Sequence, residues 1–363
     1  MELIVSLTKI IIIEQLFDKF SLTPSQKAIE KALSKKTCTL IKGVVGSGLN
    51  FRLVTAFNKL DRNLLLVMDN AEQAAYYFND LQKLLNTSQV FYFPSSYREA
   101  YHSEATNNAN VMQRSEILKK LSIKSKKKII VTYPQALFEK VISQQTLKKK
   151  TLTIKLGENI GLDLINETLF EQGFERVNFV TQPGEFSVRG GIIDVFSFAH
   201  QHPYRIEFFD EEIESLRSFD VNTQLSISPL DQIDLLPNTS MVSFSEKRKS
   251  LIDSLPKQST VVFNQLDLCL DRIEKLGIKA AKQFDSLETS IQYPPKVLFL
   301  SPQELLDRLE GQSTVLINNS DHLKPHERIS VKQSPQPSIN KQFDRLVKIL
   351  NENHASGFEN YIF

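Results

Sequence analysis

Apolar and polar residues alternate along the middle of the chain with the two-residue period of a β-strand. The alternation begins at Glu185 and is interrupted by Gly190-Gly191, a pair that lets the chain bend or approach another backbone closely. It resumes after a turn at residues 200–203 and again after an acidic turn at 210–212. The pattern predicts a compact antiparallel sheet, with strands expected at 185–189, 192–196, 204–209 and 213–219.

The same period assigns side chains to the two faces of this sheet. The face expected to be solvated carries Glu185, Ser187, Arg189, Arg205, Glu207 and Phe209. Arginine and aromatic side chains are enriched among the residues that dominate the energy of protein interfaces, so Arg189, Arg205 and Phe209 are candidate partner-binding residues. The alternative is that they are ordinary surface residues, because half-exposed antiparallel sheets commonly carry scattered apolar groups.

Continuous apolar runs alternate with helix-period segments on both sides of this sheet. The expected strands are 38–41, 64–68, 90–93 and 129–131 before it, and 261–263, 297–300 and 314–317 after it. Thr23 as N-cap, Pro24 at the first helical position and Gln26 as the return partner predict a capping box at the first helix. Strands that alternate with helices predict an α/β fold with a parallel sheet, here interrupted by a small inserted antiparallel module.

The predicted organisation follows from this interruption. Residues 324–338 are rich in Pro, Ser and Gln and resemble a linker, residues 339–350 have the period of an amphipathic helix, and residues 360–363 resemble the start of a strand. We therefore expect the chain to be a piece of a longer protein that stops just after a further domain begins. The predicted units are 1–150 and 238–323 for the two parts of the α/β domain, 151–237 for the inserted module, 324–338 for the linker and 339–363 for the truncated domain.

A glycine-rich segment lies between an expected strand and an expected helix, where a phosphate-binding loop belongs. Its candidate residues are Gly43, Gly46, Gly48, Leu49 and Asn50. A working loop needs a lysine after the last glycine and then a hydroxyl for Mg²⁺, but those positions hold leucine and asparagine. We also find no acidic box of the kind that binds Mg²⁺, since Asp69 is better explained as a helix cap. The sequence predicts a degenerate loop without ATP hydrolysis and leaves open whether its backbone amides still bind an anion.

Length, composition and charge limit the classes of protein to which this chain can belong. At 363 residues with 41% apolar content the chain should form two or three domains, and a net charge of +2 gives no case for an extended nucleic-acid footprint. Cys38 and Cys269 lack metal-ligand spacing and are typical of reduced thiols in a cytoplasmic protein. No apolar run is long enough to span a membrane. The lysine runs at 124–128 and 148–150 either contact phosphate or form solvated loops.

Five segments of the predicted module resemble a known family. They are GFERV at 173–177, PGEFSVRGGIIDVF at 183–196, PYRIEFFD at 203–210, EIESLRSFD at 212–220 and LLP at 235–237. The module is similar to domain 2 of the bacterial transcription-repair coupling factors (Mfd), which they share with the excision-repair protein UvrB. In that family it is the docking site for UvrA, and the resemblance implies that Arg189, Arg205 and Phe209 occupy the contact positions.

The resemblance implies that this chain is the N-terminal, UvrA-recruiting region of such a factor. In the intact family member, further domains use ATP and Mg²⁺ to translocate on double-stranded DNA and to dislodge stalled RNA polymerase, and a C-terminal domain masks the UvrA face. Those domains would lie beyond Phe363. This region by itself is expected to have no catalytic residues, no cofactor and no bound metal.

Two other functions stay open. The first is a UvrB-type, ATP-dependent clamp on damaged DNA, which would need a dense aromatic hairpin for base stacking. The corresponding stretch, 94–111, has only two tyrosines, Tyr97 and Tyr101. The second is a structural relic of a nucleotide-binding fold that has no partner, which only a binding assay distinguishes from recruitment.

Overall fold

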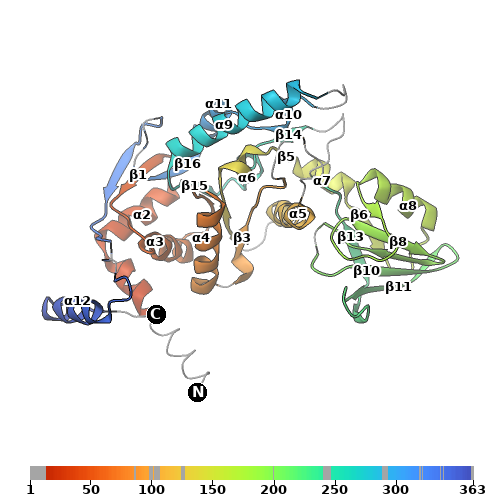
Figure 1. Ribbon diagram of the computed structural model, residues 1–363, viewed down its shortest axis with the longest axis horizontal. Coiled ribbons are helices and arrows are strands. Elements are labelled where there is room, and N and C mark those ends of the chain that lie inside the picture. The colour runs from red at the N-terminus through yellow and green to blue at the C-terminus, as the bar shows by residue number, and fades with distance from the viewer. Residues whose placement is uncertain are drawn as a thin grey trace, which may run out of the picture.

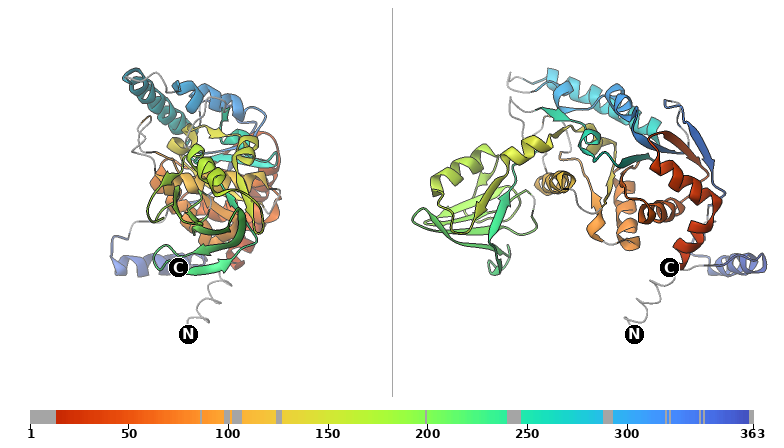
Figure 2. Two further views of the ribbon diagram at one scale, coloured as in Figure 1. Left: turned by 90° about the vertical axis from the view of Figure 1, so that its right-hand side faces the viewer. Right: turned by 180° about the vertical axis from the view of Figure 1, so that it is seen from behind.

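The structure is a computed structural model that describes residues 14–360, except for 86, 98–100, 102–106, 124–126, 199, 240–246, 288–292, 319, 321, 336 and 338. Figures 1 and 2 show a larger α/β body and, beside it, a smaller body built on a second sheet. Each body has its own cluster of buried apolar side chains. The predicted fold class, a parallel α/β sheet with an inserted antiparallel module, is confirmed.

The larger body is organised on a seven-stranded sheet, called the large sheet below, in the order β17-β1-β16-β15-β2-β4-β3. Every pair of neighbouring strands in it is parallel. Its central strands read as unbroken apolar runs because side chains are buried on both of their faces. The strands are β1 (Cys38–Lys42), β2 (Asn63–Val67), β3 (Val90–Tyr92), β4 (Ile129–Thr132), β15 (Ser259–Phe263), β16 (Ser313–Ile317) and β17 (Glu327–Ser330).

Helices connect and flank these strands (Figure 1). Helix α3 contacts both α2 and α4, and helix α9 contacts both α10 and α11. The helices are α2 (Pro24–Ser34), α3 (Gly48–Lys59), α4 (Ala71–Leu84), α5 (Asn108–Ser122), α6 (Pro134–Phe138), α7 (Gln144–Lys150), α9 (Leu266–Asp285), α10 (Pro295–Leu298), α11 (Pro302–Leu309) and α12 (Phe343–Ala355). The capping box expected at α2 is half formed. Thr23 accepts from the Gln26 amide, but the Gln26 side chain donates to the Arg52 carbonyl instead of returning to the cap.

The smaller body is a six-stranded sheet, called the small sheet below, in the order β12-β11-β10-β9-β8-β7. Its neighbouring strands are antiparallel except for the pair β7 and β8. Helix α8 (Leu162–Glu171) covers its apolar face, and a separate ladder pairs β6 (Leu152–Lys155) with β13 (Gln232–Leu235). The strands are β7 (Glu175–Arg176), β8 (Glu185–Arg189), β9 (Ile192–Val195), β10 (Tyr204–Phe209), β11 (Glu212–Phe219) and β12 (Ser226–Pro229).

Two local expectations are wrong. The strand expected at 297–300 is largely helix α10, which begins at Pro295, and only Phe299 makes an isolated bridge, to Glu139. Part of the expected linker, 324–338, is strand β17, which pairs with β1 and turns Ile329 into the core. Of the strand start expected at 360–363, residues 361–363 lie outside the described residues. In the part of the chain that the structure describes, no helix is long and apolar enough to cross a membrane.

Candidate functional site

The face predicted to bind a partner is assembled by a tight turn between β8 and β9. Gly190-Gly191 reverses the chain so that Arg189 lies opposite Ile192. Gly190 has a φ of +58°, which favours glycine, and a Cβ atom at Gly191 would lie 3.1 Å from the Phe208 carbonyl oxygen. The turn and the start of β9 therefore lie close against the end of β10, with little room for larger side chains.

Cross-strand register then places three charged residues together. Asp194 on β9 lies opposite Ser187 on β8 and opposite Arg205 on β10, and Arg205 in turn lies opposite Arg217 on β11. Residues directly opposite on one face of a sheet are within contact distance. We call this side of the small sheet the arginine face, and its residues are Arg189, Asp194, Arg205, Glu207, Phe209 and Arg217.

Asp194 binds both candidate arginines. Its side chain is only 2% exposed, and it accepts from Arg205 through Nε at 2.6 Å and Nη2 at 2.9 Å. The Nη2 atom of Arg189 donates to the same carboxylate. The hydrogen bond to Asp194 is the largest cause of the raised pKa of Arg205, so the guanidinium stays charged in this environment.

An aromatic ring supports each guanidinium. Arg205 lies over the ring of buried Phe219, with 4.6 Å from its Cζ atom to the ring centroid, and Arg189 lies over the ring of Phe179 at 5.3 Å. Cations at such distances are attracted to the ring face. The two arginines are therefore held by one carboxylate and two rings, although their side chains differ in exposure, at 41% for Arg189 and 16% for Arg205.

The rest of the arginine face contains a closed ion pair and an exposed ring. Arg217 donates through Nη1 to the Glu207 carboxylate at 2.6 Å, and this pairing holds the pKa of Glu207 below its ordinary value. Phe209 ends β10 and is 73% exposed. The chain turns immediately after it at Asp210, which has a φ of +56°. Most of the apolar surface of Phe209 is therefore exposed to solvent rather than packed against the rest of the chain.

The prediction that Glu185 and Ser187 are solvated is wrong. Both are buried because the segment 178–182 folds back over their strand. Glu185 accepts from the Thr181 and Gln182 backbone amides at 2.7 and 3.0 Å, and Ser187 donates to the Asn178 carbonyl at 3.0 Å. Strand alternation alone cannot show that a loop covers the polar face of a strand.

The structure thus brings Arg189, Arg205 and Phe209 to one face, but the sequence analysis missed the acid between them. A single acidic residue in the otherwise apolar strand 192–196 was the available signal, because a buried charge needs a partner. Phe179 was also missed. It follows β7 in an irregular segment where no period assigns a face, and it is 64% exposed.

The degenerate phosphate loop connects β1 to α3 and is covered by the chain that follows β17. The Val45 amide donates to the Gln333 Oε1 atom at 3.1 Å, and a Cβ atom at Gly48 would lie 2.4 Å from Gln333 Nε2. Gly43 has a φ of +80°, and a Cβ atom there would lie 2.2 Å from the Val331 carbonyl oxygen. A side chain of this chain therefore occupies space beside the loop and uses one of the amides that a phosphate would need.

The two positions that would carry nucleotide chemistry point into the protein. Leu49 is 4% exposed and belongs to the main core, and Asn50 is 1% exposed and donates to Asp80 at 3.3 Å. Asp69 does not cap α4, because Asn70 does so by accepting from the Gln73 amide at 2.9 Å. Asp69 instead accepts hydrogen bonds from the side chains of Asn264 and Gln265.

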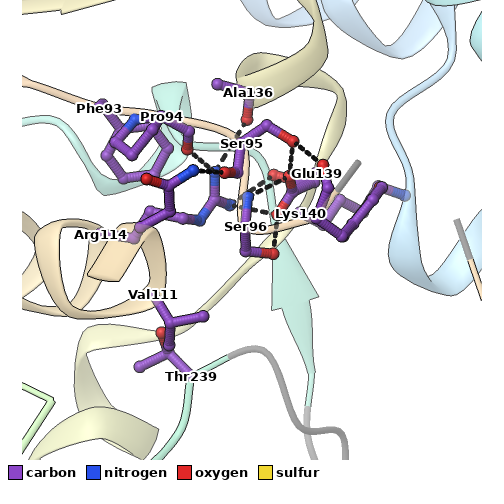
Figure 3. Close-up of polar contacts among 12 residues, drawn as sticks. Phe93, Pro94, Ser95, Ser96, Val111, Arg114, Ala136, Glu139, Lys140 and Thr239 are labelled. Carbon is purple, nitrogen blue, oxygen red and sulfur yellow. Dashed lines mark hydrogen bonds and ion pairs between the residues drawn. The ribbon is translucent and has the colours of Figure 1, made fainter. Parts of the chain in front are cut away.

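A buried polar network holds the chain just after β3, where a damage-binding hairpin would begin (Figure 3). Arg114 and Glu139 form an ion pair at 3.2 Å, with side chains 5% and 6% exposed. Glu139 also accepts from the Ser95 hydroxyl at 2.7 Å and from the Ser96 amide at 2.7 Å, while Arg114 donates to the Pro94 carbonyl at 2.7 Å. The network is internally satisfied, so we assign it a structural role.

The aromatic and basic residues near this network also make internal contacts. Tyr97 and Tyr101 both pack edge-on against Phe299, and Tyr101 donates to the Tyr293 carbonyl at 2.8 Å. Lys127 donates to the Leu60 carbonyl at 2.8 Å, just after the end of α3. Within the described residues these side chains therefore serve packing and helix capping, whereas 124–126 lie outside the described residues. Residues 148–150 form the basic last turn of α7.

Comparison with known proteins connects the arginine face to a repair family. The UvrB interaction domain matches residues 152–241, a range that contains the whole small sheet. The transcription-repair-coupling factor of Bacillus subtilis (strain 168) is 29% identical over 217 residues, which cover 60% of this chain and 18% of that protein. This chain is similar to the transcription-repair-coupling factors. The resemblance given by the sequence segments is thereby confirmed.

Staphylococcal factors extend the match over more of the chain. The transcription-repair-coupling factor of Staphylococcus aureus (strain bovine RF122 / ET3-1) is 24% identical over 294 residues, or 80% of this chain and 25% of that protein. That of Staphylococcus epidermidis (strain ATCC 35984) is 24% identical over 292 residues, or 79% of this chain and 25% of that protein. The chain thus spans a quarter or less of the length of these curated relatives.

Proposed function

We propose that this chain serves transcription-coupled repair by recruiting UvrA, and that it corresponds to the N-terminal, UvrA-docking region of a transcription-repair-coupling factor. The observation that carries the proposal is the arginine face itself. Within the residues that match the UvrB interaction domain, Arg189, Arg205 and Phe209 meet on one side of the small sheet. Charged donors beside an exposed aromatic ring are typical of interface anchors.

The proposal includes no catalysis by this chain alone and no cofactor. Leu49 and Asn50, at the positions where a working loop has lysine and a hydroxyl, are buried, and the Val45 amide donates to Gln333. In the proposal, ATP, Mg²⁺, double-stranded DNA and RNA polymerase belong to other parts of the intact factor, and a C-terminal domain of that factor masks the arginine face. The chain should show no ATP turnover above that of a Gly48→Arg variant, in which the loop is blocked. Turnover that Gly48→Arg abolishes would contradict this part of the proposal.

Calorimetric titration with purified UvrA tests the recruitment. We expect the unmodified chain to bind and Arg205→Ala to bind at least tenfold more weakly, because the change removes charge-assisted hydrogen bonds that organise the arginine face, worth about 1.5–3 kcal/mol. Circular dichroism must show that the variant is folded. Lys275→Ala is the matched control, since it removes an exposed cation paired with Asp271 on α9 and should leave binding unchanged.

The outcomes separate the hypotheses. If the unmodified chain does not bind UvrA, the recruitment proposal is wrong and the relic without a partner becomes the better description. If Arg205→Ala and Lys275→Ala behave alike, UvrA binds elsewhere on the chain.

A further inference from the structure

We propose that Asp194 is the positioning residue of the arginine face, fixing Arg189 and Arg205 as one unit that fits a single carboxylate of the partner. This inference rests on the proposed function and adds what the partner surface must provide. It departs from the simpler expectation, two arginines that each pair with a separate acid of the partner, because the structure shows an acid of this chain already bound to both.

Charge determines the stoichiometry of the contact. Two guanidiniums and one carboxylate leave one uncompensated positive charge on the unit. Both oxygens of Asp194 are engaged, Oδ1 by Arg205 and Oδ2 by both arginines. Because its side chain is 2% exposed, an acidic partner would approach the guanidinium edges without meeting the Asp194 oxygens. One carboxylate would neutralise the unit, whereas a second would add a repulsive charge.

The two arginines contribute differently to this contact. Arg205 uses Nε and Nη2 on Asp194, and Nη2 also reaches Gln224 at 3.3 Å, so most of its donors are committed within the chain. Arg189 binds Asp194 through Nη2, and its side chain is 41% exposed. A guanidinium carries five N–H donors, so Arg189 can hold Asp194 and still donate to a second carboxylate. We therefore assign the direct contact mainly to Arg189 and a supporting role to Arg205.

The surroundings of the unit define the rest of the partner surface. Phe179, which lies against Arg189, is 64% exposed, and Phe209 is 73% exposed. The neighbouring cation, Arg217, is already neutralised by Glu207. The chemistry complementary to this arrangement is one Asp or Glu of the partner set among apolar side chains that cover the two rings.

Asp194→Asn distinguishes positioning from simple charge attraction because the two mechanisms predict opposite signs. The variant keeps the shape of the side chain and raises the charge of the unit from +1 to +2. If charge alone governed binding, affinity for an acidic partner would rise. If positioning governs it, the guanidiniums are freed and must be ordered again on binding, which costs affinity. We expect UvrA binding to weaken about tenfold.

Asp271→Asn is the matched control, since it makes the same change of charge at an exposed ion pair on α9, outside the arginine face. We expect its affinity to change by less than about threefold, and to change toward tighter binding at low salt. Thermal unfolding curves identify a temperature at which all variants are folded, and the titrations with UvrA are carried out at that temperature.

Arg189→Lys serves if Asp194→Asn does not fold. It conserves charge at an exposed position but removes the planar fork that can hold two carboxylates at once, so we expect severalfold weaker binding. The inference is wrong if Asp194→Asn binds UvrA as tightly as the unmodified chain or more tightly. If Asp194→Asn does not fold, the same result with Arg189→Lys decides against it. Either result leaves the recruitment of UvrA intact. Absence of binding by the unmodified chain would instead reject the proposed function, and this inference with it.

Discussion

Phe209 offers a quantitative test of the arginine face because its contribution to binding can be worked out from its exposure. The residue is 73% exposed in the free chain, so a partner that covers it would bury about three quarters of its surface. Complete burial of a phenylalanine side chain is worth about 1.5–3 kcal/mol. Phe209→Ala should therefore cost about 1–2 kcal/mol of binding free energy, which is about 5- to 30-fold in the dissociation constant.

The same exposure predicts that the free chain is nearly indifferent to the change. The free energy of unfolding should move by no more than about 0.5 kcal/mol, as for other surface substitutions. Calorimetric titration with UvrA, beside urea unfolding of the variant, measures both quantities.

Phe343 provides the control for this experiment. It is also a phenylalanine, it is 75% exposed, and it lies on α12 outside the residues that match the UvrB interaction domain. Phe343→Ala should leave UvrA binding unchanged. Equal losses in the two variants, or no loss in Phe209→Ala when the unmodified chain binds, would refute the assignment of Phe209 as an interface anchor.

Three further predictions concern stability. Glu139→Ala should lower the free energy of unfolding by about 3–5 kcal/mol in urea titrations, because its arginine partner stays buried without a countercharge; a loss below 1 kcal/mol would contradict the assigned network. Gly184→Ala should cost about 1–3 kcal/mol, since φ is +89° and its Cβ would lie 2.4 Å from a buried phenyl ring; an unchanged melting temperature would argue against this geometry. The Arg217 hydrogen bond lowers the pKa of Glu207, so its stabilisation is complete above the pKa of the unfolded chain and is lost as pH falls through the folded pKa. Arg217→Ala should therefore flatten the acid limb of the stability profile, and an unaltered limb would exclude this pair as a contributor.

Much of the fold follows from local pattern, and the errors have physical causes. Strands buried on both faces read as apolar runs, which is why the order of strands and helices was predictable. Strand β17 was missed because it is an edge strand, in which Ile329 is the one buried side chain and the remainder is as polar as a linker. Helix α10 was mistaken for a strand because it is a short apolar segment, where the two periods cannot be told apart.

The candidate site shows a similar division. The period of a strand correctly predicted that Arg189, Arg205 and Phe209 share a face, since alternation depends on neighbours in sequence. It could not reveal the partner of the arginines. Asp194 reaches them through the register of β8, β9 and β10, which depends on how three strands are aligned. The hydrogen bond from Val45 to Gln333 could not be predicted for a similar reason, because the two residues lie 288 positions apart in the sequence.

The loop between β1 and α3 satisfies one of its backbone amides from within the chain. A loop of amides that point toward an absent phosphate would leave donors without acceptors, which is costly wherever water is excluded. Here the neutral Gln333 side chain supplies one acceptor, at 3.1 Å from the Val45 amide. The position after the last glycine is part of the core, because Leu49 is 4% exposed, and a buried lysine there would need a countercharge. Because Leu49 belongs to the core and Gln333 fills the space beside the loop, we expect that a phosphate site would need changes at both positions.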